Sequence, residues 1–288
     1  MFIRLENISF TYCLNMPFET EVLKNINLEI DEGEIVGLIG HTGCGKTTLI
    51  QHLNGLLTPN VGKVFVEGED VNAKGTNLKK IRQKVGLVFQ YPENQLFEDT
   101  IYKEIAFGPH KLNLSEDEVE KRVREALQIV DLDYKNYAER SPFSLSGGEM
   151  RRVALASVLS IKPKILILDE PTANLDPQGR NNILSEIKEM HHKLGITVIL
   201  VSHNMEKIAE IVKRLLVMHK GEIIIDGSPQ DIFEKRSKQL IDVGLGLPQV
   251  TKCMHELKDK GKEIYTGVLT VDDAEKEIFN RLKKVNKK

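Results

Sequence analysis

The chain has 288 residues, of which 41% are hydrophobic and 28% are charged, close to the averages of soluble globular proteins. This composition excludes disordered and fibrous proteins, and the length predicts one main domain with an appendage. The 40 Lys and Arg against 42 Asp and Glu leave a net charge of -2, which favours neither nucleic acid nor an anionic bilayer as a partner. The three cysteines are far apart, so we expect no disulfide framework or zinc site, and a reducing cytosol.

No segment has the pattern of a secretion signal or a membrane span. Residues 1–6 lack a basic region followed by an apolar stretch. The apolar runs, such as residues 165–168, are strand-sized and far shorter than the ~20 residues that cross a bilayer. We therefore expect a cytosolic protein whose membrane association is through protein contacts.

The first buried strand is expected at residues 35–39 and runs into a glycine-rich loop. That loop reads Gly40-His41-Thr42-Gly43-Cys44-Gly45-Lys46-Thr47, and an apolar helix over residues 48–53 begins directly after it with Thr48. Glycines let backbone N–H groups point inward at phosphate oxygens, and the helix adds its positive N-terminal end. We expect Lys46 to reach the β- and γ-phosphates of a nucleotide and the Thr47 hydroxyl to ligate Mg²⁺. An ordinary glycine-rich turn is the alternative, but a chance match in such a chain is on the order of one in a hundred.

Residues from about 90 to 144 are expected to form a helical lobe inserted into the core. Within it, residues 115–130 have the pattern of an amphipathic helix that Ser115 and Glu118 open as a capping box. The apolar face of this helix consists of Val119, Val123, Leu127 and Val130.

A second anion-binding helix start follows this lobe. The segment Leu145-Ser146-Gly147-Gly148-Glu149 precedes a helix expected at about residues 150–159, so a serine and two glycines lie at its positive end. A single nucleotide does not need two such cradles.

Two acids follow the buried strand expected at residues 165–168. This strand delivers Asp169 and Glu170 to its C-terminal edge, where open α/β sheets bind ligands. We expect Asp169 to hold Mg²⁺ through water and Glu170 to polarise the attacking water. Solvated acids at a strand end are the alternative for the pair alone, and the phosphate loop argues against it.

The last part of the chain continues the alternation and then changes pattern. Residues 197–201 are a further buried strand, which favours an α/β fold with parallel strands, and residues 215–226 are expected to form a hairpin. After residue 228 we expect a helix, a β-prone run at residues 264–269, and a helix opened by Thr270 and Asp273. We assign residues 1–228 to the main domain and residues 229–288 to a small C-terminal α/β domain.

Taken in order, these motifs resemble the ATP-binding cassette family over residues 1 to about 228. The resemblance implies a P-loop ATPase core with an antiparallel β region and an inserted helical lobe. It also implies that the signature segment, Ser146 to Glu149, binds the γ-phosphate of an ATP held by a partner subunit. Two chains would then face each other head to tail, with two ATP molecules sandwiched between Lys46 of one and Ser146 of the other.

The other loops of that family have counterparts in this chain. Tyr12 resembles the aromatic residue that stacks on adenine, with a core tyrosine, or stacking by Phe18 instead, as the alternatives. Gln90 resembles the glutamine that touches the metal site and couples it to the membrane subunit. Asn174-Leu175-Asp176 resembles the loop that crosses the dimer, and His203 resembles the switch histidine that contacts the γ-phosphate. A lone His or Gln is usually structural, but the order and spacing of the motifs argue otherwise here.

The sequence departs from the family pattern at two positions. Glu149 stands where the family more often has glutamine, which bears on the affinity of the signature segment. Cys44 lies inside the phosphate loop, and if its thiolate is accessible, alkylation should block ATP binding.

Further details resemble the ATPases of energy-coupling factor importers of vitamins and metals, in particular the second of their two paralogous ATPases. The segments that carry this resemblance are Gly40-His41-Thr42-Gly43, Pro17-Phe18-Glu19, residues 89–97 and Gly244-Leu245-Gly246-Leu247-Pro248. The resemblance implies Mg²⁺ with ATP, a peripheral position on the cytoplasmic side of the cell membrane, and a C-terminal region that helps to hold an ATPase dimer. The implied partners are a second, similar ATPase, a transmembrane coupling subunit and membrane substrate-capture subunits, with no nucleic acid.

Several other functions stay open from the sequence. Within transport, the alternative is a homodimeric ATPase of a dedicated cobalt, nickel or other importer. A chromosome-maintenance ATPase would need long coiled coils between Lys46 and Ser146, which are too close together for that. A ribosome-acting cassette protein carries two cassettes in one chain, and this chain has one. ATP turnover by the assembled complex would exclude a non-enzymatic nucleotide sensor.

Overall fold

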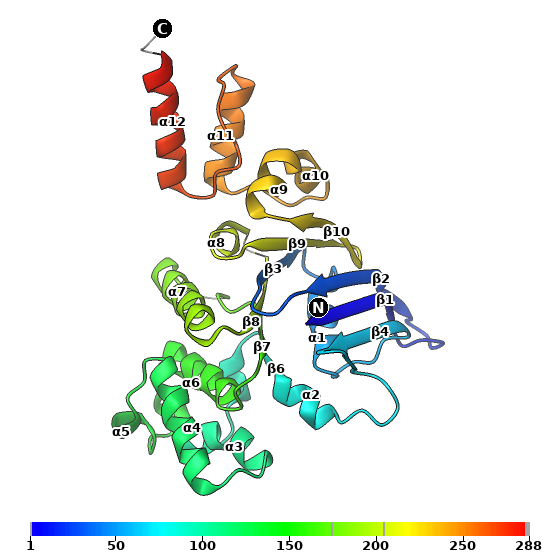
Figure 1. The fold of residues 1–288 in the computed structure, drawn as a ribbon, viewed down its shortest axis with the longest axis vertical. Helices are drawn as coiled ribbons and strands as arrows, with labels where there is room; N and C mark the ends of the chain where they lie inside the picture. Colours follow the sequence, from blue (N-terminus) through cyan, green and yellow to red (C-terminus); the bar gives the residue numbers. More distant parts are fainter. Residues whose placement is uncertain (1, 174, 204, 286–288) are drawn as a thin grey trace.

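The computed structural model describes residues 2–173, 175–203 and 205–285. Across these residues the chain forms two β-sheets with helices packed around them (Figure 1). The antiparallel sheet has the order β2-β1-β4-β5 and consists of β1 (Ile3–Tyr12), β2 (Thr20–Ile30), β4 (Val61–Val66) and β5 (Glu69–Asp70). The larger sheet has the order β10-β9-β3-β8-β7-β6 and consists of β3 (Ile35–Gly40), β6 (Val85–Val88), β7 (Ile165–Asp169), β8 (Thr197–Ser202), β9 (Arg214–His219) and β10 (Glu222–Gly227).

The helices of the described residues fall into three groups. Between the strands of the central sheet, outside the helical layer, the chain forms α1 (Lys46–Leu53), α2 (Leu78–Lys84), α7 (Pro177–Leu194) and α8 (Met205–Ala209). The helical layer consists of η1 (Pro92–Gln95), α3 (Ile101–Lys111), α4 (Glu116–Ile129), α5 (Tyr134–Tyr137), η2 (Pro142–Ser144) and α6 (Gly147–Leu159). The C-terminal group consists of α9 (Pro229–Lys235), α10 (Ser237–Asp242), α11 (Gln249–Asp259) and α12 (Val271–Val285). No described helix combines the length and the apolar character that crossing a membrane requires.

The central sheet confirms the parallel α/β core. Strands β3, β7 and β8 are buried along their whole length, which explains why they are continuous apolar runs rather than alternating ones. All pairs from β9 to β6 are parallel, and β9 pairs with β10 as the expected antiparallel hairpin. The C-terminal ends of β3 and β7 therefore meet at one edge of the sheet, on either side of β8. This strand order brings the phosphate loop and the two acids together.

Two apolar clusters cover the two faces of this sheet. Ile165 and Ile167 point to the cluster that α1 and the antiparallel sheet complete, whereas Leu166 and Leu168 point to the cluster that the helical layer completes. This alternation follows from the two-residue period of a strand. Because both faces are packed, the edge that carries the loops is held by a fully formed core.

The helical layer includes the helix that follows the signature segment. Helix α6 packs against α3 and α4, so the layer extends past residue 144. Helix α4 begins where the sequence predicts, since the Ser115 hydroxyl accepts a hydrogen bond from the Glu118 N–H. The reciprocal half of a capping box is replaced by an ion pair, because the Glu118 carboxylate contacts Arg122 at 2.9 Å.

The C-terminal region differs from the expected α/β arrangement. Residues 264–269 are extended but form no strand with any described residue, and the region is helical on both sides of them. The Thr251 hydroxyl donates to the Val268 carbonyl, and the Glu277 carboxylate accepts from the Tyr265 N–H. A β-prone run becomes a strand only beside another strand, and here α11 and α12 flank it instead.

The C-terminal helices do not all pack on the same core. Helices α9 and α10 bury Ile232, Phe233 and Leu240 in the same cluster as the central sheet. Helices α11 and α12 pack around a separate small cluster of Met254, Val268 and Ala274, and they lie at the far end of the molecule from α3 and α4 (Figure 1). The boundary between residues 228 and 229 stays a prediction.

Candidate functional site

The phosphate loop joins the end of β3 to the start of α1. Gly45 is the N-cap of α1 with φ 107°, in the left-handed region that glycine adopts without strain. A Cβ at Gly40 would lie 2.4 Å from the Met218 carbonyl oxygen, so the backbone of β9 leaves no room for a side chain there. The Lys46 ammonium is buried and donates to the carbonyls of Gly40, at 2.7 Å, and His41, at 2.9 Å. The loop thus holds a buried cation at its centre.

The two acids lie directly opposite this loop. The Thr47 hydroxyl donates to Asp169 Oδ2 at 2.9 Å, across the gap that β8 spans. Asp169 is buried, and burial raises the pKa of its carboxyl, while the hydrogen bond from Thr47 acts in the opposite direction. A hydroxyl and a carboxylate oxygen in contact are ligands that suit Mg²⁺.

Glu170 is held in a strained and well-defined position. Its φ is 51°, a left-handed value that is uncommon for glutamate. Residues with such backbone strain are frequent at functional sites. Oε1 accepts from the His203 N–H at 2.9 Å and from His203 Nδ1 at 2.8 Å, and Oε2 accepts from the Ser202 hydroxyl at 3.1 Å. These contacts bring together the two residues expected to act on the attacking water and the γ-phosphate.

One cleft of about 380 Å³ joins these groups, a size typical of ligand sites. Its lining consists of Tyr12, Val22, Thr42, Gly43, Gly45, Lys46, Thr47, Thr48, Gln90, Asp169, Glu170 and His203. Every one of these except Val22 is a residue that the sequence predicts. Val22 carries no motif and is found only because β2 passes beside the phosphate loop.

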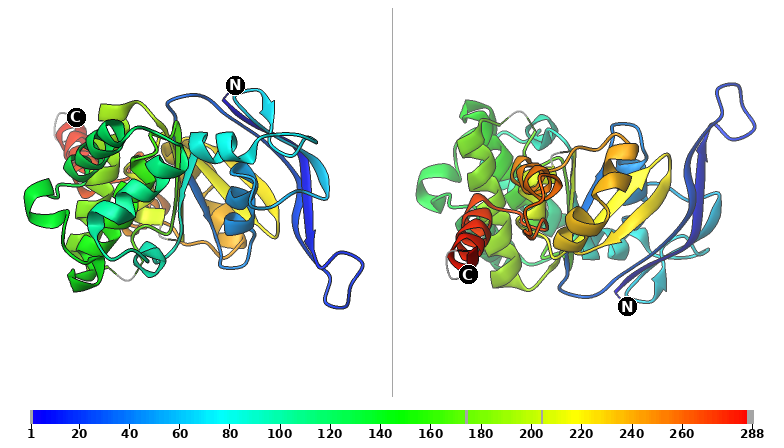
Figure 2. Two further views of the ribbon diagram at one scale, coloured as in Figure 1. Left: turned by 90° about the horizontal axis from the view of Figure 1, so that it is seen from below. Right: turned by 90° about the horizontal axis from the view of Figure 1, so that it is seen from above.

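The aromatic position at one end of the cleft is Tyr12 rather than Phe18. Tyr12 is partly exposed, packs edge-on against Phe10 at 4.8 Å between ring centroids, and its hydroxyl lies 3.2 Å from the Thr48 hydroxyl. Phe18 is 91% exposed on the loop between β1 and β2, which projects from the body of the protein (Figure 2). A ring already anchored at the cleft is the better stacking surface for a base.

Three loop residues do not face the cleft. The Cys44 side chain is buried beneath the loop, and burial raises the pKa of its thiol, so the condition for its rapid alkylation is not met. His41 Nε2 donates instead to the Val243 carbonyl at 3.0 Å, at the end of α10. Gly40 lies at the base of the loop, against β9. The His41 contact ties the phosphate loop to the C-terminal region, and no sequence signal points to it.

The signature segment lies outside the cleft and is exposed. Ser146 caps α6 and forms a full capping box with Glu149: Glu149 Oε2 accepts from the Ser146 N–H and hydroxyl, at 2.9 and 2.7 Å. The Tyr137 hydroxyl donates to Glu149 Oε1 at 2.7 Å. Hydrogen bonds from Ser146 and Tyr137 lower the pKa of Glu149 to about 2. The departure from the family pattern therefore gives Glu149 a local role as the cap partner of Ser146.

The loop after the acids is only partly described. Asn174 lies outside the described residues. Asp176 is the N-cap of α7, and its carboxylate accepts from the Gly179 N–H at 2.6 Å. Within this chain the Asp176 side chain therefore caps α7, and its place in a dimer stays a prediction.

The amino-acid sequence matches one known protein family. The family model described as ABC transporter matches residues 23–173. The energy-coupling factor transporter ATP-binding protein EcfA2 of Clostridium tetani is 52% identical over 279 residues, covering 97% of this chain and 96% of the relative. The protein of the same name from Caldanaerobacter subterraneus subsp. tengcongensis is 52% identical over 281 residues, covering 98% of each.

Solved structures of the same fold are similar to this chain as well. The cbiO1 protein from Clostridium perfringens, described as part of the ABC transporter complex cbiONQ, has a TM-score of 0.75 and 35% identity, covering 88% of this chain and 98% of that one. The ATP-binding cassette MJ0796, in a dimeric post-hydrolysis state with ADP and Pi, has a TM-score of 0.69 and 30% identity, covering 78% of this chain and 98% of that one. This chain belongs to the ABC transporter family and, within it, to the energy-coupling factor transporter ATP-binding proteins.

Proposed function

We propose that this chain binds ATP with Mg²⁺ in its cleft and lends Ser146, Gly147 and Gly148 to the ATP of a partner ATPase. One observation supports this most directly. A Cβ at Gly147 or Gly148 would meet no atom within 4 Å, so nothing in this chain's own packing requires glycine there. Glycine at the exposed start of a helix allows a ligand from outside to reach the backbone N–H groups. A nucleotide on the partner is such a ligand.

Each residue of the cleft has a role in this proposal. Lys46 leaves the two loop carbonyls and binds the β- and γ-phosphates, and Tyr12 stacks on the adenine. Glu170 accepts a hydrogen bond from the attacking water and orients it. His203, which is hydrogen-bonded to Glu170, contacts the γ-phosphate. The position of the Glu170 carboxylate therefore depends on whether a γ-phosphate is bound.

The residues around Asp169 fit a magnesium ion. Thr47 and Asp169 are in contact and Gln90 lines the same cleft, so three side chains with oxygen atoms are available. No cluster of three or more His, Cys, Asp or Glu side chains within the described residues could hold a metal by itself. Mg²⁺ is commonly held by one or two protein ligands together with substrate phosphates, whose charge it neutralises when bound.

The partners follow from the relatives. Two relatives at 52% identity over nearly the full chain are named as ATP-binding proteins of energy-coupling factor transporters. We infer a heterodimer with a second, similar ATPase, docked from the cytoplasmic side on a transmembrane coupling subunit that serves membrane substrate-capture subunits for vitamins or metal ions. The likeness to cbiO1 at 35% identity supports the alternative, an ATPase of a dedicated importer, less strongly.

The C-terminal region has a place in the same assembly. Helix α12 exposes Val271, Phe279 and Leu282, an apolar set that is costly to leave in water. We infer that residues 229–288 help to hold the ATPase pair together.

The signature segment provides the decisive test. In the assembled transporter, Ser146→Ala should lower ATP hydrolysis by about tenfold or more, because one of the two composite sites loses a phosphate ligand. Ser157→Ala is the matched control: Ser157 lies on the same helix, and its hydroxyl donates to the Val153 carbonyl at 3.1 Å. Hydrolysis by the Ser146 variant at the rate of the control would refute the composite site.

Copurification tests the partners. Mass spectrometry of untagged proteins that remain with this chain after detergent extraction should identify a second ATPase and membrane subunits. Recovery of ribosomes or nucleic acid in their place would refute the transport proposal.

A further inference from the structure

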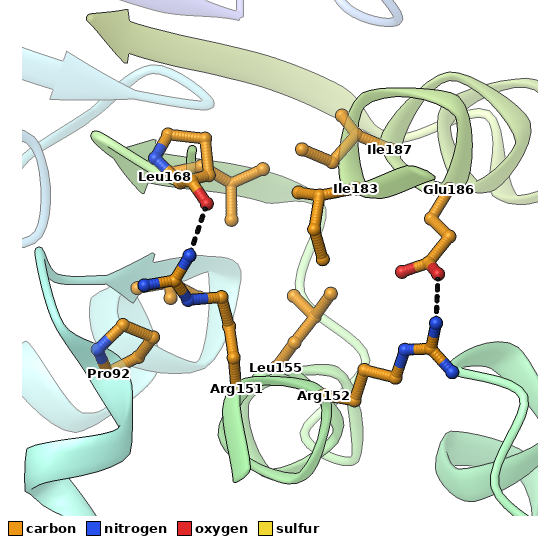
Figure 3. Close-up of a pocket in the computed structure, with 10 residues that line it drawn as sticks. Pro92, Arg151, Arg152, Leu155, Leu168, Ile183, Glu186 and Ile187 are labelled. Atoms are coloured by element: carbon orange, nitrogen blue, oxygen red, sulfur yellow. Dashed lines mark hydrogen bonds and ion pairs between the residues drawn. The ribbon is translucent and has the colours of Figure 1, made fainter. Parts of the chain in front are cut away.

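Arg151 is a buried cation on the signature helix that the cleft does not use. It follows Ser146 by five residues on α6 and is 6% exposed. Figure 3 shows that Arg151 and Arg152 leave α6 in different directions, with Arg152 reaching Glu186 on α7. A buried charge without a function is costly, so its contacts need an explanation.

The Arg151 guanidinium contacts the turn that follows Glu170. Nη1 donates to the Pro171 carbonyl at 3.1 Å, and both terminal nitrogens lie 3.4 Å from the Ala173 carbonyl. Pro171 is the next residue after Glu170, and the Ala173 N–H donates back to the Glu170 carbonyl at 3.0 Å. A shift of Arg151 would therefore act directly on the backbone that places Glu170.

The same guanidinium contacts the segment that follows Gln90. Nη2 lies 3.4 Å from Glu93 Oε1, and Glu93 lies in η1, which packs against α6. Gln90 is three residues before Glu93 and lines the cleft. One side chain thus joins the signature helix to two segments of the chain's own nucleotide site.

These contacts are poorly optimised for stability alone. Arg151 Nε and Glu93 Oε2 are buried without a hydrogen-bond partner among the described residues. Beside them, an apolar cavity of about 20 Å³ separates α6 from α7, with Leu155, Ile183 and Ile187 in its wall (Figure 3). Apolar side chains in place of such a pair are often at least as stable, and a cavity means lost packing. Helix α6 is therefore held on the core by these polar contacts as well as by its buried apolar side chains.

We propose that Arg151 is a positioning residue that couples the two composite ATP sites through this chain. Binding of the partner's ATP at Ser146 sets the position of α6, and Arg151 passes that position to the turn after Glu170 and to the Gln90 segment. The site at which this chain supplies Glu170 then becomes active when the other site is filled. This inference rests on the proposed function, since it requires a partner ATPase.

The test uses the assembled transporter with three variants of this chain. Arg151→Lys keeps the charge and loses the planar fork that reaches two segments at once. Glu93→Gln removes the ion pair and leaves the arginine. Arg124→Gln is the control, since Arg124 is an exposed arginine of the helical layer that pairs with Glu120 on its own helix.

Arg151→Lys should lower kcat about tenfold while KM and the ATP dissociation constant of the full-length chain stay within about twofold, as expected for a residue on a coupling path. Glu93→Gln should act in the same direction, and Arg124→Gln should not change kcat. In the Ser146→Ala background, Arg151→Lys should have little further effect, because the signal from the signature segment is already lost.

Three results would overturn the inference. The first is a kcat within about twofold of the original in both variants, and the second is an ATP affinity that weakens in parallel with kcat. The third is an effect of Arg151→Lys that multiplies fully with that of Ser146→Ala. If Arg151→Lys does not fold, Glu93→Gln decides, because its side chain is partly exposed and its substitution keeps the shape. If the complex with the unsubstituted chain does not hydrolyse ATP, the proposed function is refuted. If that complex hydrolyses ATP and neither Arg151→Lys nor Glu93→Gln changes kcat, only this inference is refuted.

Discussion

Replacing Glu170 by glutamine should separate ATP binding from ATP cleavage in this protein. The substitution keeps the shape of the side chain and removes the carboxylate that we propose orients the attacking water. In the structure, the amide oxygen can keep the place of Oε1, which accepts from the His203 N–H and Nδ1. The amide nitrogen then takes the place of Oε2 beside the Ser202 hydroxyl, which can turn and accept from it. The local hydrogen bonds therefore survive the change.

The expected effects differ widely in size. Exchanging charge-assisted for neutral hydrogen bonds at Glu170 should change the free energy of unfolding by about 1 kcal/mol. Losing the base should slow steady-state turnover by ~10³, which corresponds to roughly 4 kcal/mol of barrier. Steady-state phosphate release by the assembled complex measures the second effect, and thermal unfolding of the full-length chain measures the first.

The same variant should still close with its partner in the presence of ATP, because no phosphate ligand has been removed. Size-exclusion chromatography or site-specific crosslinking with ATP and with ADP measures this closure. Unchanged steady-state hydrolysis would remove Glu170 from its proposed role. Loss of ATP-dependent closure would instead show that the carboxylate is needed for binding.

Further predictions concern the two glycine-rich segments. Gly40→Ala should destabilise the protein by about 1–3 kcal/mol and abolish ATP binding, because the added methyl group would overlap the Met218 carbonyl. Calorimetry measures both the stability and the binding. An unaltered melting temperature would contradict the predicted overlap. Glu149 has a pKa lowered from 4.5 to about 2, so its capping contribution is complete above pH 4.5 and is lost as the pH falls toward 2. The melting temperature of Glu149→Gln should accordingly lie below that of the original by a constant amount above pH 5, and the gap should narrow below pH 4.5; a gap that does not depend on pH would exclude this role. Because burial raises the pKa of the Cys44 thiol, iodoacetamide should modify Cys44 at least about ten times more slowly than exposed Cys13, as peptide mass spectrometry can measure, and equal rates would show that the loop opens.

Motifs that act over a few neighbouring residues could be read from the sequence. The phosphate loop and the two acids lie where the sequence predicts, at the C-terminal ends of the buried strands β3 and β7, and Ser146 begins α6 as its N-cap. The placement of Lys46 opposite Asp169 also follows, because parallel strands bring their C-terminal ends to one edge. Resemblance to a known family supplied the remaining loops, including Tyr12 and Gln90.

Contacts between distant segments could not be read in this way. The run at residues 264–269 has the composition of a strand, yet no described strand lies beside it to complete the ladder. Three further features depend on segments that are far apart in the sequence: the burial of Cys44, the hydrogen bond from His41 to Val243, and the hydrogen bond from Arg151 to Ala173. No periodic pattern in the sequence indicates any of them. Such contacts depend on where whole elements pack.

The sequence by itself thus predicted the chemistry of this protein: a phosphate cradle, a metal-ligand pair, a water-orienting glutamate and a second cradle, each expected from local backbone geometry and residue type. The tertiary structure decided how these parts act together. It placed Ser146 outside the cleft with open space beside Gly147 and Gly148, and it joined the signature helix through Arg151 to the turn that follows Glu170. Burial and long-range packing depend on the positions of all elements at once, and for that reason they emerge only when the chain has folded.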